Sequence, residues 1–234
     1  GQTKHLLAGC PRSGKETAMM ALTVIIPERL QYSNDKINLW TATIPSTICE
    51  PLNELSKVKG MMVNGRFIDY DRLKIYIDRH WWDKNKDNLE AKARIWASEN
   101  TQVIDRVEDI PAIHPAGQVP VLIAPYHRMA FDKKKDKQLR DEYRPLIGRI
   151  GTMVIGEGHK FLKSVNRMWQ ILKQLEPEFL LPVTGTPYEL IFCDESSDLY
   201  FGPKERSIMT RDEMMAMKRA NPTGEFKDIP DIHY

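Results

Sequence analysis

The sequence predicts a three-layer α/β fold in which a mainly parallel sheet is covered by helices on both faces. Short apolar runs, typical of strands buried on both faces, recur along the 234 residues, and stretches with the helical spacing of apolar residues lie between them. This alternation favours parallel strands joined by crossover helices. A hydrophobic content of 41% is sufficient for a buried core.

The expected elements follow one another in a regular order. The predicted strands are the runs HLLA from His5, INLWTATI from Ile37, VPVLIA from Val119, TMVIG from Thr152 and FLLPVTG from Phe179. The predicted helices are the stretches 15–26, 47–58, 136–147 and 164–175. Ligands of open parallel sheets bind beyond the carboxyl ends of the strands, so we expect functional residues in the loops that follow them.

Residues 68–118 fit this alternation poorly, because charged and aromatic residues dominate them. We interpret them as an insertion with an amphipathic helix at 89–98, and we expect Trp96 to anchor that helix in the core rather than to form a binding element. Residues 1–200 are predicted to form one domain. Residues 201–234 are predicted to be a polar C-terminal extension with a short helix at 211–220.

Composition argues against several classes of protein. Thirty-four basic and 32 acidic residues give a formal net charge of +2, so contact with nucleic acid or a membrane would have to be local. The three cysteines, Cys10, Cys49 and Cys193, lack metal-ligand spacing and are interpreted as free thiols in a reducing intracellular compartment. No apolar run reaches the roughly 18 residues of a membrane span, so no membrane partner is expected.

A phosphate-binding loop is predicted at the start of the chain. The stretch GCPRSGK matches the pattern G-x-x-x-x-G-K between a predicted strand and a predicted helix, which is the context that this motif requires. Backbone N–H groups would surround phosphate oxygens, and the Lys15 ammonium would reach the same oxygens. The alternative is a strand-to-helix turn with a surface lysine. The residues expected at the nucleotide are Gly9, Arg12, Ser13, Gly14, Lys15, Glu16 and Thr17.

Two later segments carry groups suited to phosphate chemistry. One strand runs into Gly156, Glu157, Gly158 and His159. A glutamate at this place would orient or deprotonate an attacking water, and the histidine after it would sense the phosphate site. Another strand runs into Thr184, Gly185 and Thr186, where hydroxyls at a strand's carboxyl end can contact both the acidic segment and the phosphates.

These segments, in this order, resemble the Swi/Snf-type ATPases of helicase superfamily two, specifically their first RecA-like lobe. LLAGCPRSGKET resembles motif I, TIPSTICEPLNEL motif Ia, VPVLIAPYHRM motif Ib, VIGEGHKFLKS motif II and LLPVTGTP motif III, over about residues 5–189. The resemblance implies a RecA-like P-loop NTPase lobe that binds ATP and Mg²⁺ and couples hydrolysis to movement along duplex DNA in the nucleus. It implies that Lys15 and Glu157 are catalytic and that motif III links the nucleotide to DNA.

Two departures from the family pattern affect the magnesium site. Glu16 stands where motif I has threonine, and Gly156 stands where motif II has aspartate. The Glu16 carboxylate is a candidate metal ligand, but it would have to fit a pocket built for a hydroxyl while Mg²⁺ demands a near-ideal octahedron. We therefore expect the metal site to be weakened or lost and hydrolysis to be impaired.

The second lobe of the family is expected elsewhere, in the same or another chain. The residues that follow Pro187 are fewer than the roughly 100 that another α/β domain requires. One lobe alone should bind duplex DNA weakly, because the family grips DNA between two lobes. Two hypotheses stay open: an ATP-binding lobe impaired in hydrolysis, and a non-catalytic scaffold that binds DNA or a protein partner.

Overall fold

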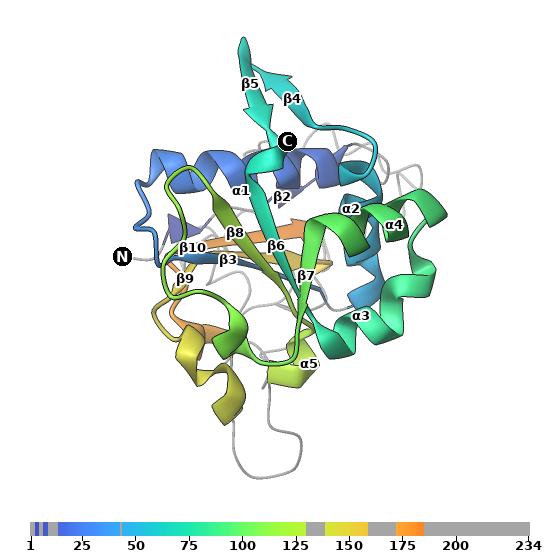
Figure 1. Cartoon of the computed structure of the whole chain (residues 1–234). Helices are drawn as coiled ribbons and strands as arrows, with labels where there is room; N and C mark the ends of the chain where they lie inside the picture. Colours follow the sequence, from blue (N-terminus) through green and yellow to red (C-terminus); the bar gives the residue numbers. More distant parts are fainter. Residues whose placement is uncertain are drawn as a thin grey trace, which may run out of the picture.

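The computed structural model describes residues 3–4, 7–8, 14–42, 44–129, 139–158 and 172–184. Within these ranges the main sheet has eight strands, and every neighbouring pair is parallel. The spatial order is β1-β10-β9-β3-β8-β6-β7, with β2 also pairing with β10 (Figure 1). The strands are β1 (Thr3–Lys4), β2 (Leu7–Ala8), β3 (Ile37–Ala42), β6 (Leu73–Asp78), β7 (Thr101–Ile104), β8 (Val119–Ile123), β9 (Ile150–Gly156) and β10 (Phe179–Thr184). The predicted α/β class with a parallel sheet is confirmed.

The central strands are buried on both faces, as their continuous apolar runs predict. All six residues of β3 are buried, and alternate side chains enter opposite cores. Trp40 and Ala42 belong to the core beneath α1 and α2, whereas Ile37 and Leu39 belong to the core on the other face. The sheet is therefore the middle layer of the fold, with one hydrophobic core on each of its faces.

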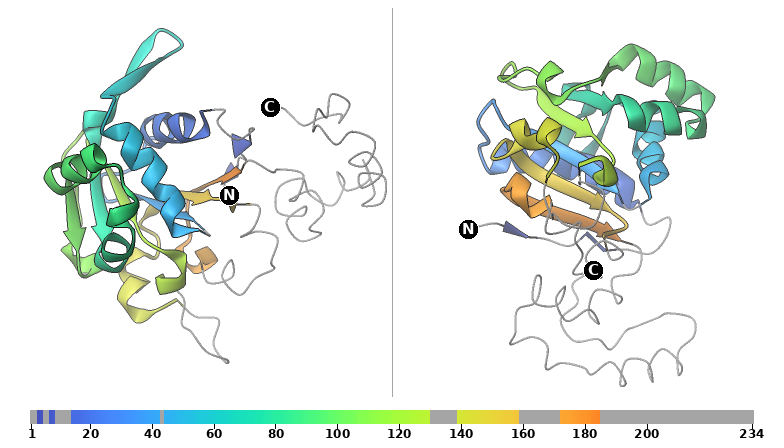
Figure 2. Two further views of the ribbon diagram at one scale, coloured as in Figure 1. Left: turned by 90° about the vertical axis from the view of Figure 1, so that its right-hand side faces the viewer. Right: turned by 90° about the horizontal axis from the view of Figure 1, so that it is seen from below.

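The α-helices are α1 (Lys15–Arg29), α2 (Cys49–Leu55), α3 (Arg79–Asn85), α4 (Ala91–Asn100) and α5 (Tyr126–Met129). Short 3₁₀ helices connect them: η1 (Pro45–Ile48), η2 (Tyr70–Arg72), η3 (Lys86–Asn88), η4 (Val107–Asp109), η5 (Asp141–Leu146) and η6 (Lys173–Leu175). Views from two further directions show α1 and α2 on one face of the sheet (Figure 2).

The predicted helices are found with changed lengths. The helix predicted at 15–26 extends to Arg29, and the one predicted at 47–58 is divided between η1 and α2. The stretch 136–147 is described only from residue 139 and contains the 3₁₀ helix η5, in which Pro145 removes a backbone donor. Of the stretch 164–175, only residues 172–175 are described, and they include η6.

Residues 68–118 differ from the expected insertion, because they supply two strands of the main sheet. β6 lies between β8 and β7, and both pairings are parallel. Lys74 interrupts the apolar run of β6, and β7 is only four residues long. Neither sequence therefore has the long apolar run from which a buried strand is predicted. In α4 the residues that are fully buried are Ala93 and Ala97, and Trp96 packs against the core while only partly buried.

A hairpin that the sequence analysis did not predict projects beside α1 (Figure 1). Its strands β4 (Gly60–Val63) and β5 (Arg66–Asp69) are antiparallel. Asn64 and Gly65 between them have φ of 48° and 77°, the signature of a two-residue hairpin turn. Glu28 of α1 forms an ion pair with Arg66 of β5, which attaches the hairpin to the helix, and a second one with Arg72 of η2.

The predicted C-terminal extension, 201–234, and its helix at 211–220 lie outside the described residues. Among the helices that are described, none combines the length and the apolar character that crossing a bilayer requires.

Candidate functional site

A cavity of about 90 Å³ lies where α1 begins and where β3, β9 and β10 end. Five residues predicted from three separate sequence segments line it: Lys15, Glu16, Gly156, Glu157 and Thr184. Parallel strands end at one edge of a sheet, and this shared edge brings the segments together. The pairing of Gly156 with Ala42 of β3 on one side and with Val183 of β10 on the other fixes their relative position.

The remaining predicted site residues divide into two groups. Gly14, Thr17 and Gly158 are described but do not line the cavity. Six others lie outside the described residues: Gly9, Arg12, Ser13, His159, Gly185 and Thr186.

The first turn of α1 places a positive charge and the positive end of the helix dipole at the cavity. Gly14 caps the helix in the left-handed conformation, with φ 79°, which glycine adopts without strain. The helix ladder begins with the bond from Ala18 N–H to the Gly14 carbonyl, so the N–H groups before Ala18 belong to the first turn and have no acceptor within the helix. Together with the Lys15 ammonium, whose side chain is only 10% exposed, they favour a negative group.

Two carboxylates stand close to this lysine. The Glu16 carboxylate lies 4.0 Å from the Lys15 ammonium. Glu50, on α2, also lines the cavity, and the pKa of its carboxyl is raised by burial and then by the neighbouring Glu16 and Glu157. Sequence reasoning missed Glu50. Glu50 could have been found because it lies three residues after Thr47, in the stretch that resembles motif Ia, and residues at this spacing share one face of a helix.

The end of β9 has an unusual backbone. Glu157 has φ 53°, a left-handed conformation that costs a non-glycine residue about 1–2 kcal/mol. Such a cost is retained where the surrounding structure requires a side chain in a given place, and it is common at functional sites. The backbone therefore holds Glu157 at the cavity in a conformation that an unconstrained loop would not adopt.

A buried hydroxyl at the cavity has no partner among the described residues. Thr41 of β3 is 2% exposed, lines the cavity, and its Oγ1 forms no hydrogen bond with any described group. By the alternation along β3 this side chain lies on the face of Leu39, away from α1, so the orphan hydroxyl does not mark a ligand in the cavity. Thr41 was not predicted from the sequence.

The residues at the cavity fit a phosphate better than they fit Mg²⁺. Lys15 and the helix start can donate to phosphate oxygens. For the metal, Gly156 offers no ligand, and a Cβ atom added to it would meet the Cβ of Ala42 at 3.0 Å. In the described part of the chain, no group of three or more His, Cys, Asp or Glu side chains is arranged to hold an ion. The residues present therefore do not fit a Mg²⁺ ion held as in the resembled motifs.

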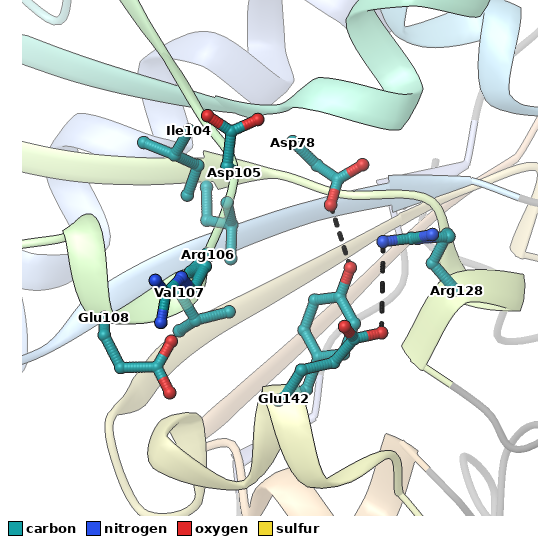
Figure 3. Close-up of a pocket in the computed structure, with 10 residues that line it drawn as sticks. Asp78, Ile104, Asp105, Arg106, Val107, Glu108, Arg128 and Glu142 are labelled. Carbon is teal, nitrogen blue, oxygen red and sulfur yellow. Dashed lines mark hydrogen bonds and ion pairs between the residues drawn. The ribbon is translucent and has the colours of Figure 1, made fainter.

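A second hollow, of about 110 Å³, lies at the carboxyl ends of β6 and β7 (Figure 3). Asp78, at the end of β6, accepts hydrogen bonds from the Tyr143 hydroxyl at 2.9 Å and from the Trp81 N–H at 3.0 Å. Arg128 of α5 lies 3.9 Å from Glu142. Because Asp78 has both oxygens engaged, this hollow is a structural junction between β6, α3 and η5.

Comparison with known proteins adds no assignment. No protein-family model matches the chain, and no curated protein matches it significantly.

Proposed function

We propose that this chain is an ATP-binding lobe of the type found in the Swi/Snf-like DNA-dependent ATPases, impaired in hydrolysis. The observation that carries the proposal is that the predicted segments after β2, β9 and β10 contribute Lys15, Glu157 and Thr184 to one cavity. The strand order also supports it, since it places these three segments at one end of the sheet. By the same resemblance, the proposed partners are duplex DNA and a second RecA-like lobe, and the proposed location is the nucleus.

In this proposal, the start of α1 and the Lys15 ammonium bind the phosphates of ATP. Glu157 serves as the base for an attacking water, but the reaction is slow because no residue here replaces the missing metal ligands. Glu16 and Glu50 add negative charge beside the phosphates, which weakens nucleotide binding.

A non-catalytic scaffold that binds DNA or a protein partner is the second candidate. The observation that favours it is the close fit around Gly156, where Ala42 fills the space that an aspartate side chain would need. A lobe in which side chains fill the magnesium site can still bind a partner, although it does not hydrolyse ATP.

The test is titration of a fluorescent ATP analogue into the protein and into Lys15→Ala. The proposal predicts weak binding that falls by at least about tenfold in the variant, because a charged partner of the phosphates contributes roughly 1.5–3 kcal/mol. Lys92→Ala, an exposed lysine on α4, is the matched control and should bind as the unmodified protein does. Equal binding by Lys15→Ala, with the fold intact, would exclude this cavity as the nucleotide site and favour the scaffold.

A further inference from the structure

A third cavity, of about 220 Å³, lies between η1, α3 and the beginning of α5. Its polar lining comes from Ser46, His80, Lys84, Asn85, Asn88 and His127. None of the residues that line it also lines the cavity at Lys15. An inference about this cavity therefore stands independently of the proposed nucleotide site.

The wall of this cavity is fixed by buried contacts. Trp81 is fully buried, and its indole Nε1 donates to the Pro45 carbonyl at 3.0 Å, which joins α3 to η1. Asn85 is buried and donates from Nδ2 to the Trp81 carbonyl at 2.8 Å. The Asp78 carboxylate caps the start of α3. Because these contacts hold α3 against η1, the cavity is formed before any ligand arrives.

The polar groups at its mouth have unused hydrogen-bonding capacity. The rings of His80 and His127 lie edge to face with centroids 5.9 Å apart. Within the described residues, the side chains of Ser46, Lys84 and Asn88 form no hydrogen bond or ion pair. Ammonium, hydroxyl, amide and imidazole groups can all donate, and several donors converging on one space are complementary to an oxyanion.

The charges that face the histidines favour an anion over a cation. Burial lowers the pKa of His80 first and Lys84 and Arg128 lower it further, whereas Asp78 and Asp83 oppose this shift. Burial is also the largest cause that lowers the pKa of His127, followed by His80, Lys84 and Arg128, with Asp78 opposing. Asp78 keeps its negative charge but directs its two oxygens to Trp81 and Tyr143. Asp83 lies 3.9 Å from Lys86 and Arg128 lies 3.9 Å from Glu142. Within the described residues Lys84 forms no ion pair, so its ammonium is the cation that remains available to an anion.

We propose that this cavity binds a phosphate group through Lys84, His80 and His127, and that its affinity rises as the pH falls. The positive charges nearby disfavour protonation of the two imidazoles, and a bound oxyanion would offset this repulsion. Binding of the anion and protonation of the histidines therefore favour each other. The phosphate can belong to a small molecule or to a nucleic-acid backbone, because both present the same oxygens to these donors. A site of this kind would make binding at this sheet edge sensitive to pH between about 5 and 7.

The experiment follows the imidazole resonances of His80 and His127 by NMR from pH 5 to 8, with and without inorganic phosphate. We expect phosphate to raise the pKa of both rings, and its affinity to rise by about tenfold for each pKa unit gained by one ring. Lys84→Ala and His127→Asn should reduce the affinity. Both positions are exposed, so neither change disturbs the core. Lys92→Ala is the matched control and should titrate unchanged.

A parallel titration with a short duplex oligonucleotide distinguishes the two sources. Shifts with inorganic phosphate support the proposal with a small phosphate as ligand, and shifts with the oligonucleotide alone support it with a backbone phosphate. Unchanged histidine pKa values with both ligands would overturn it. Shifts that persist at full size in Lys84→Ala would also overturn it, since the anion would then lie elsewhere.

Discussion

A Cβ atom on Gly156 would lie 3.0 Å from the Cβ of Ala42, on the neighbouring strand. Few Cβ atoms in proteins tolerate so close an approach, so the strand ends have adjusted to glycine at this position. Gly156, which stands where the proposed family has an aspartate, is therefore a packing determinant.

The first prediction concerns this contact. Gly156→Ala should lower the free energy of unfolding by about 1–3 kcal/mol, because it overpacks a well-filled edge of the sheet. The double variant with Ala42→Gly should recover part of this loss, and denaturant unfolding of the four proteins in the cycle measures the coupling. Additive effects of the two changes would contradict the contact.

Strands β3, β8, β9 and β10 were predictable from the sequence, whereas β6 and β7 were not. Strands such as β3 and β10 lie in the buried middle and carry continuous apolar runs that can be recognised without knowledge of their neighbours. β7 is the last strand of the sheet, is four residues long and is only partly buried, so its sequence has no continuous apolar run from which a strand could be predicted.

At the candidate site, the sequence predicted those lining residues that belong to a recognisable sequence pattern, and it did not predict the others. Lys15 and Glu157 follow recognisable strand ends. Glu50 and Thr41 reach the cavity only because α2 and β3 pack beside α1 and β9, and no local pattern reports such packing. Tertiary contacts thus added the Glu50 carboxylate to the predicted set.

The second prediction compares two buried tyrosines. Tyr143→Phe should destabilise the protein by about 1.5–3 kcal/mol, because it removes a buried hydrogen bond to the carboxylate of Asp78. Tyr70→Phe is the matched control: its hydroxyl is buried and has no partner among the described groups, so its removal should be neutral or stabilising. Urea unfolding of both variants is the measurement, and equal losses would contradict the assignment.

The third prediction concerns alkaline stability. Burial raises the pKa of Tyr32 from 10.0 to about 12. The folded state therefore keeps the proton that the unfolded chain loses above pH 10, so the stability contributed by this group is full below pH 10 and is lost as the pH rises through 12. Tyr32→Phe should reduce the loss of stability between pH 10 and 12. An unchanged slope in unfolding experiments would show that Tyr32 titrates normally.

The fourth prediction links Glu50 to nucleotide affinity. Its carboxyl has a raised pKa, so lowering the pH removes a negative charge beside the cavity and should tighten the binding of phosphates. Glu50→Gln should bind more tightly at neutral pH and lose this part of the pH dependence. Glu54→Gln, one turn further along α2 and absent from the cavity lining, is the control. Parallel pH profiles for all three proteins would exclude a role for Glu50.

The role of the metal gives the most direct test of the proposed function. The measurement is the affinity for ATP by calorimetric titration, once with Mg²⁺ and once with a chelator. Because Gly156 provides no metal ligand and Glu16 lies beside Lys15, we expect weak binding that Mg²⁺ changes by less than about threefold, and that Lys15→Ala abolishes. Binding that Mg²⁺ tightens by tenfold or more, or no binding even at millimolar ATP, would contradict a lobe that holds nucleotide without its metal.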